Sequence, residues 1–146
     1  MMQHHLVLRV IAKLLFAPIL LFAFYVQFHG DFGPGGGFQA GLIFASAFVL
    51  HGLLFDVSSA RQFLPDRLLQ VGAAVGVLLY AGTGLASVLL GGNFLDYDHL
   101  AEAPTSGQHL GIILVEAGVG ITVACVVVMV FRAFADHLPC LREQDW

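Results

Sequence analysis

Four long runs of hydrophobic residues, separated by short polar or glycine-rich segments, dominate the sequence. A helix needs about 20 predominantly apolar residues to cross the hydrocarbon of a bilayer. The sequence therefore predicts an all-α integral membrane protein whose four transmembrane helices lie near residues 6–28, 38–56, 68–90 and 110–131. Because the connections are short, we expect residues 1–146 to form a single membrane domain.

The composition excludes several classes of protein. Of the 146 residues, 58% are hydrophobic and 11% are charged, whereas soluble domains contain about 25% charged residues. Too few charges are present to cover a water-soluble core. The net charge of −4 and the lack of a basic run argue against nucleic-acid binding, which depends on clustered Lys and Arg. Cys125 and Cys140 lie at different depths, so neither a disulfide framework nor a thiolate metal site is expected.

The positive charges predict an orientation. Four crossings place all the Lys and Arg residues on one side of the membrane: Arg9, Lys13, Arg61, Arg67, Arg132 and Arg142. Positively charged short loops stay on the cytoplasmic side. We therefore expect both termini to be cytoplasmic and the glycine-rich segment after the first helix to be external.

Small residues recur at helical spacing in the second and third hydrophobic runs. Such residues let helix backbones approach closely in a membrane. We expect these faces to need a protein neighbour, and a partner subunit is a reasonable candidate; the residues are Gly37, Gly41 and Ala45, then Gly72, Gly76 and Gly84.

The segment from His29 to Phe38 contains five glycines and Pro34. This composition predicts a tight turn with positive φ angles that opens into the N-terminus of the second helix. Its free amides and the helix dipole could bind an anionic group such as a carboxylate of a partner subunit. Alternatively, the glycines serve only a compact turn and close packing.

The same segment carries a family resemblance. The motif, with its glycines between two hydrophobic helices, closely resembles the signature of the B subunits of Mrp-type cation/proton antiporters; its residues here are His29, Gly30, Pro34, Gly35, Gly36, Gly37, Phe38, Gly41 and Leu42. Two positions depart from the family pattern, because Ala40 stands where a second glycine is common and Asp31 where a second histidine is common.

The resemblance implies a function and a location. It implies a small, non-enzymatic subunit of a hetero-oligomeric antiporter that exchanges Na⁺ for H⁺, without a cofactor, in the bacterial plasma membrane. The expected partners are larger antiporter-like subunits and the lipid bilayer. The alternative is a non-catalytic membrane-arm subunit of a related electron-transfer-driven ion pump, such as a membrane-bound hydrogenase.

Three ionisable residues are candidates for an ion pathway. Glu116 lies within the fourth run, where an unsatisfied carboxyl costs several kcal/mol. It could relay protons or line a cation path, or it could be a hydrogen-bonded neutral group. His109 lies seven residues earlier, on a similar helical face. His51, near the cytoplasmic end of the second run, could shuttle protons or be a bonded interfacial histidine.

The remaining charged residues and histidines do not predict a catalytic or cofactor site. Arg9 and Lys13 are four residues apart and could meet an acidic residue of a partner, or the headgroups of anionic lipids. Bis-histidine haem ligation needs two histidines facing each other at similar depth, and only His51 lies well inside a run. We therefore predict no cofactor and no metal site.

Overall fold

The computed structural model describes residues 2–30, 35–55, 57–101 and 103–137, with only the backbone at residues 2–5 and 58–60. Within this part, the helices are α1 (Met2–His29), α2 (Gly37–Phe55), α3 (Val57–Phe63), α4 (Asp66–Leu89), the 3₁₀ helix η1 (Tyr97–Leu100) and α5 (Pro104–His137). Four of them, α1, α2, α4 and α5, are long and apolar enough to cross a membrane. The prediction of an all-α chain with four membrane-length helices is confirmed.

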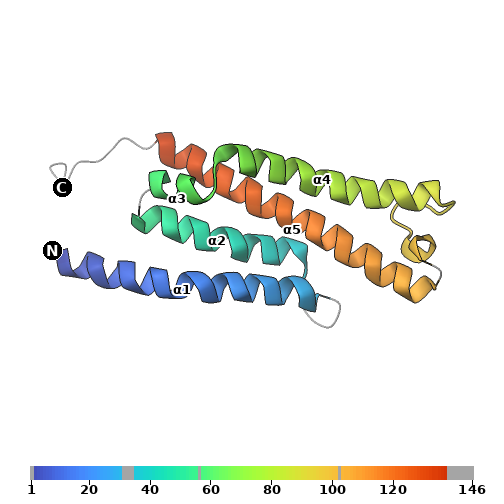
Figure 1. The fold of residues 1–146 in the computed structure, drawn as a ribbon, viewed down its shortest axis with the longest axis horizontal. Helices are drawn as coiled ribbons and strands as arrows, with labels where there is room; N and C mark the ends of the chain where they lie inside the picture. The colour runs from blue at the N-terminus through green and yellow to red at the C-terminus, as the bar shows by residue number, and fades with distance from the viewer. Residues whose placement is uncertain (1, 31–34, 56, 102, 138–146) are drawn as a thin grey trace.

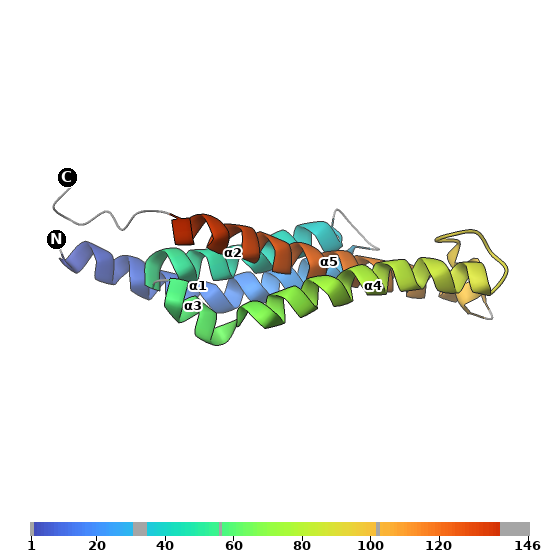
Figure 2. The ribbon, with the colours of Figure 1, turned by 90° about the horizontal axis from the view of Figure 1, so that it is seen from above.

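The four long helices do not pack in chain order. α5 contacts both α2 and α4 extensively, and α1 packs mainly on α2. The spatial order is therefore α1, α2, α5, α4 (Figure 1). The start of α1 and the end of α5 lie at one end of the molecule, together with α3, and η1 lies at the opposite end (Figures 1 and 2).

Glycine residues set the close approach of α5 to both neighbours. A Cβ atom placed on Gly41 of α2 would lie 2.6 Å from the carbonyl oxygen of Gly120. On the other side of α5, a Cβ atom on Gly118 would lie 2.8 Å from the carbonyl oxygen of Gly76. Nothing larger than hydrogen fits at these crossings. At these crossings the small-residue faces of α2 and α4 are therefore covered by α5 of the same chain, whereas Gly84 of α4 is covered by Phe94.

Helix boundaries differ from the hydrophobic runs at two places. The connection between the second and third runs contains α3, and α4 already begins at Asp66. α5 spans 34 residues, from Pro104 to His137, or about 51 Å at 1.5 Å per residue. Hydropathy detects only the apolar middle of such a helix. Its first residue, Pro104, suits that position because the first backbone N–H of a helix has no intrahelical acceptor.

The outer surface of the four helices is strongly apolar. Leu14 of α1 and Leu21 are each 70% exposed, Leu78 of α4 is 68% exposed, and Phe134 of α5 is 72% exposed. Only 11% of the apolar window of α1 is buried inside the chain. Such a surface suits lipid chains or the helices of other membrane subunits rather than water.

Candidate functional site

The glycine-rich turn links the end of α1 to the start of α2. Gly36 has a φ of +142°, a conformation that L side chains rarely adopt, which explains a glycine at this position. Its carbonyl oxygen accepts a 3.0 Å hydrogen bond from the backbone N–H of Ala40, so the first turn of α2 begins here. Pro34 of the motif lies outside the described residues, and Phe38 is 58% exposed.

The carboxylate of Glu116 lies against this turn. A Cβ atom placed on Gly30 would lie 2.7 Å from Oε2 of Glu116 and 2.8 Å from Oε1, and one on Gly36 would lie 3.3 Å from Oε1. A Cβ atom on Gly37 would collide with the carbonyl oxygen of Glu116 itself. The missing side chains of Gly30 and Gly36 therefore make the space that the carboxyl group occupies, and that of Gly37 lets the backbone of α5 approach. The sequence left open whether this turn binds an anionic group or serves only close packing; the structure places the carboxyl group of Glu116, from the same chain, against it.

The position of Glu116 is electrostatically favourable. The first amides of a helix have no intrahelical acceptors, and the N-terminus carries a partial positive charge. Glu116 is partly buried and lies beside Gly36 and Gly37, where α2 begins. A negative charge at such a place is stabilised by about 0.3–1 kcal/mol. The arrangement can hold a carboxylate within a membrane-spanning helix.

Two further histidines that the sequence singled out, one in the motif and one in α5, are both exposed. His29 is exposed, and its ring stacks on Tyr25 with centroids 5.0 Å apart. His109 is exposed and lines a shallow hollow with Thr105 and Ile113. It precedes Glu116 by seven residues, or about 10 Å along the axis of α5, so it does not share the glycine turn with the carboxylate.

His51 lies far from the turn. It follows Gly37 by fourteen residues, which is about 21 Å along α2. Its ring lies among Phe16, Phe55 and Phe63, with centroids 5.9, 4.8 and 5.6 Å away. In the described part of the chain, its Nε2 atom is buried and has no hydrogen-bond partner. The structure therefore does not bring His51 and Glu116 into one site.

A cleft of about 350 Å³ lies between α1, α2 and α5. Its lining is apolar apart from Gln27 of α1 and Cys125 of α5. Oε1 of Gln27 would lie 2.7 Å from a Cβ atom on Gly120, so Gln27 reaches across to the backbone of α5. Sequence reasoning missed Gln27, although an amide inside a hydrophobic run was an available signal.

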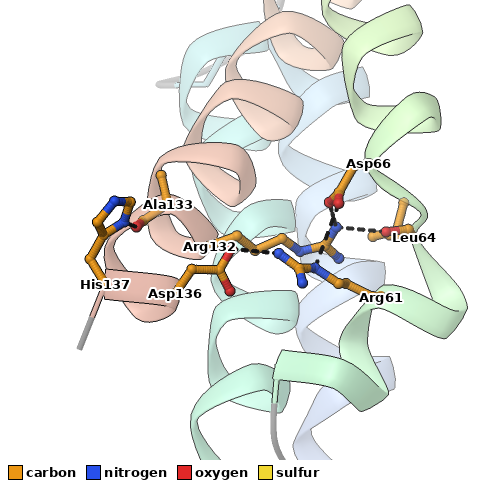
Figure 3. A network of polar contacts seen from close by, with 7 residues as sticks. All are labelled: Arg61, Leu64, Asp66, Arg132, Ala133, Asp136 and His137. Atoms are coloured by element: carbon orange, nitrogen blue, oxygen red, sulfur yellow. Dashed lines mark hydrogen bonds and ion pairs between the residues drawn. The ribbon is translucent and has the colours of Figure 1, made fainter. Parts of the chain in front are cut away.

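A second polar group joins α3, α4 and α5 at the end of the molecule opposite the turn (Figure 3). The side chain of Arg132 is 3% exposed, and its guanidinium donates hydrogen bonds to the carbonyl oxygen of Leu64 (2.7 Å) and to Oδ1 of Asp66 (2.8 Å). Arg61 lies 3.6 Å from Asp66 and 2.5 Å from Asp136. Sequence reasoning used Arg132 only to orient the chain and missed its burial.

Comparison with known proteins confirms the family resemblance of the sequence over most of the chain. The sequence profile described as a domain related to the MnhB subunit of Na⁺/H⁺ antiporter matches residues 7–129. The chain belongs to this MnhB-related family. A relative from Staphylococcus haemolyticus named antiporter subunit mnhB2 is 38% identical over 141 residues, which are 92% of this chain and 97% of the relative. A relative of the same name from Staphylococcus aureus strain Newman is 38% identical over 140 residues, with the same coverage of both chains.

The MnhB match includes the glycine turn and the residue that fills it. Its range, residues 7–129, contains Gly30, Gly36 and Glu116 as well as most of α1 and α5. Arg132 and Asp136 lie beyond its end. Membership of a family of antiporter subunits, with four membrane-length helices, makes this chain a multi-pass membrane protein of the transporter class.

Proposed function

We propose that this MnhB-family chain is a small subunit of a multisubunit Na⁺/H⁺ antiporter of the bacterial plasma membrane, where it packs against larger subunits and contributes Glu116 to an ion route. The observation that carries this proposal is the Glu116 carboxylate held against Gly30 and Gly36. A carboxyl among transmembrane helices is costly unless it is satisfied and is a functional candidate by default.

The geometry favours a role in which the carboxyl group of Glu116 gains and loses a proton without leaving the glycine turn. The carboxylate form of Glu116 interacts favourably with the N-terminus of α2, whereas protonation removes that attraction. Gly30 and Gly36 let the carboxyl group lie directly against the turn, and its partly buried position limits access by water. Glu116 is therefore the proposed acceptor for a proton, or ligand for Na⁺, that arrives from a neighbouring subunit. His109 and His51 are secondary candidates, because neither lies in the glycine turn.

The exposed apolar faces provide the surface for those neighbours. α1 and α4 are the outermost helices of the row, and Leu21 and Leu78 are among their most exposed side chains. We place both termini in the cytoplasm, because the Lys and Arg residues of the described chain belong to the end of the molecule where α1 begins and α5 ends: Arg9, Lys13, Arg61, Arg67 and Arg132. The glycine turn is then on the external side of the membrane. The whole chain forms a single membrane domain.

The test is Glu116→Gln in the complete antiporter, with exchange measured in everted membrane vesicles. Glutamine keeps the shape of the side chain but cannot titrate. We expect Na⁺/H⁺ exchange to fall about a hundredfold, the lower end of the contribution of a proton-transferring side chain. Co-purification of the other subunits should be unchanged. The matched control is Asp98→Asn, which neutralises an exposed carboxylate in η1 that accepts a 2.8 Å hydrogen bond from Gln108; exchange should be normal.

Wild-type exchange by the Glu116→Gln complex would show that the carboxyl is structural and would remove it from the ion route. Recovery of the tagged chain without any antiporter-like subunit would contradict the wider proposal of a hetero-oligomeric antiporter.

A further inference from the structure

Two cations from α1 converge on one aromatic ring of α2. The Nζ atom of Lys13 lies 5.3 Å from the centroid of the Phe55 ring, and the Cζ atom of Arg9 lies 6.0 Å from it. Both side chains are exposed. Cation–π attraction at such distances is worth about 0.5–1 kcal/mol at an exposed site, so the ring holds two like charges close together at the edge between α1 and α2.

No carboxylate compensates this pair of charges in the part of the chain that the structure describes. At the same end of the molecule, Arg61 pairs with Asp66 and Asp136, and Arg132 pairs with Asp66. Arg9 and Lys13 have no such partner among residues 2–30, 35–55, 57–101 and 103–137. Two adjacent exposed cations that no described carboxylate neutralises attract an anion at the membrane surface.

The depth of the pair indicates which anion is available. α2 has 19 residues, or about 28 Å, close to the roughly 30 Å thickness of the hydrocarbon. Phe55 is its last residue, so this ring lies where the hydrocarbon meets the headgroups. α1 continues beyond the end of α2 (Figure 1). Arg9 and Lys13 are therefore at the level of lipid phosphates.

The surroundings provide for both parts of a lipid. Leu6, Val10 and Leu14 of α1 are 65%, 55% and 70% exposed, so an apolar surface runs along the helix past the two cations. Phe55 is itself held by its stack on His51, with ring centroids 4.8 Å apart, and His51 packs edge-on against Phe63. These ring contacts hold the Phe55 ring in place beneath the two cations, whose side chains are exposed.

We propose that Arg9, Lys13 and Phe55 form a binding site for the phosphate of an anionic phospholipid. The guanidinium of Arg9 donates hydrogen bonds to phosphate oxygens, and Lys13 adds a second positive charge at the same headgroup. The acyl chains lie along the exposed apolar surface of α1. This site lies at the opposite end of α2 from Glu116 and is independent of any role of that carboxyl in transport.

The experiment uses the complete complex in nanodiscs of neutral phosphatidylcholine, to which a phosphatidylglycerol with a photoactivatable headgroup is added. Crosslinked peptides are identified by mass spectrometry. We expect labelling of the peptides that contain Arg9, Lys13 or Phe55, and competition by unlabelled phosphatidylglycerol but not by added phosphatidylcholine. Each basic residue near a membrane surface contributes enough to anionic-lipid binding that Arg9→Gln/Lys13→Gln should lower the apparent affinity at least about tenfold.

Arg67→Gln is the matched control. Arg67 is also exposed and has no carboxylate partner in the described residues, but it lies on α4 without an aromatic platform; labelling should be unchanged. If the double glutamine variant does not assemble, the competition series on the wild-type complex still decides. Competition by inorganic phosphate, unchanged labelling of a well-assembled double variant, or labelling that phosphatidylcholine competes equally would each overturn the site.

Discussion

Arg132 of α5 and Asp66 of α4 form a 2.8 Å ion pair in which one partner is buried and the other is not. The Arg132 side chain is 3% exposed, whereas that of Asp66 is 54% exposed. A buried guanidinium is costly to leave without its anion, but an exposed carboxylate is readily hydrated. The two residues should therefore respond differently to substitution, although they belong to the same interaction.

Asp66→Leu should destabilise the chain more than Arg132→Met. Loss of the carboxylate leaves the Arg132 charge buried, at a cost of about 3 kcal/mol. Loss of Arg132 removes the buried charge and leaves Asp66 in solvent, so about 1 kcal/mol is expected. Thermal unfolding of the purified chain in mild detergent measures both. The control is Arg67→Met, because Arg67 is next to Asp66 in the chain but exposed; it should leave the stability unchanged. Equal losses of stability in Asp66→Leu and Arg132→Met would contradict the prediction.

Gly41→Ala should separate α2 from α5. The added methyl group would lie 2.6 Å from the carbonyl oxygen of Gly120 and 3.0 Å from Cβ of Val123, so the helix backbones must move. We expect a loss of about 1–3 kcal/mol in unfolding free energy, as for other overpacked sites. Gly82→Ala is the matched control, because a Cβ atom there has nothing within 4 Å. That change should be neutral or stabilise the helix by up to about 1 kcal/mol.

Gly30→Ala should displace the carboxylate of Glu116. The new methyl group would lie 2.7 Å from Oε2, and the carboxylate is the movable partner. Exchange should fall, and the stability lost should return in Gly30→Ala/Glu116→Ala, where the obstacle is gone. Gly36→Val should not be rescued in this way, because its φ of +142° is strained for valine whatever residue 116 is. Unfolding of Gly30→Ala and Gly36→Val, each alone and combined with Glu116→Ala, provides the comparison; rescue of both glycine variants by Glu116→Ala would contradict the prediction.

The connection between α4 and α5 should lose stability at alkaline pH. Burial, and then the nearby Tyr80, raise the pKa of Tyr97 above its usual 10.0. The folded state thus retains the phenol proton at a pH where the unfolded state has lost it. Stability is complete below about pH 10 and falls as pH rises through the folded pKa. Phenolate absorbance and thermal unfolding across this range test the effect, and Tyr97→Phe should reduce the loss of stability at alkaline pH.

The number of membrane helices could be predicted because lipid imposes a strong length rule on apolar segments. Their neighbours could not. Gly41 and Gly76 were recognisable as contact positions, but spacing alone does not say whether a helix of the same chain or of a partner covers them; both meet α5. Glu116 and the glycine turn were both singled out, yet nothing in the sequence joins them, since the pairing depends on the rotation of α5 about its own axis.

The polar group around Arg132, which joins α3, α4 and α5, was harder still to predict from the sequence. Arg132 had the sequence context of a charge at the end of a hydrophobic run, which usually reaches toward the membrane surface. Its burial depends on α3 and on the carbonyl group of Leu64, and this backbone geometry follows a connection that hydropathy treats as a loop. The ion-route roles of Glu116, His51 and His109 stay predictions.

The central position of α5 has a consequence for biogenesis. α1, α2 and α4 are synthesised before α5, yet α4 makes its main contacts with α5, and α2 contacts α5 as extensively as it contacts α1. When the first three spans have entered the bilayer, the glycine faces of α2 and α4 are still open to lipid or to other chains. The final helix must insert between them, so the native arrangement forms late in translation, and factors that protect half-assembled spans would act in that interval.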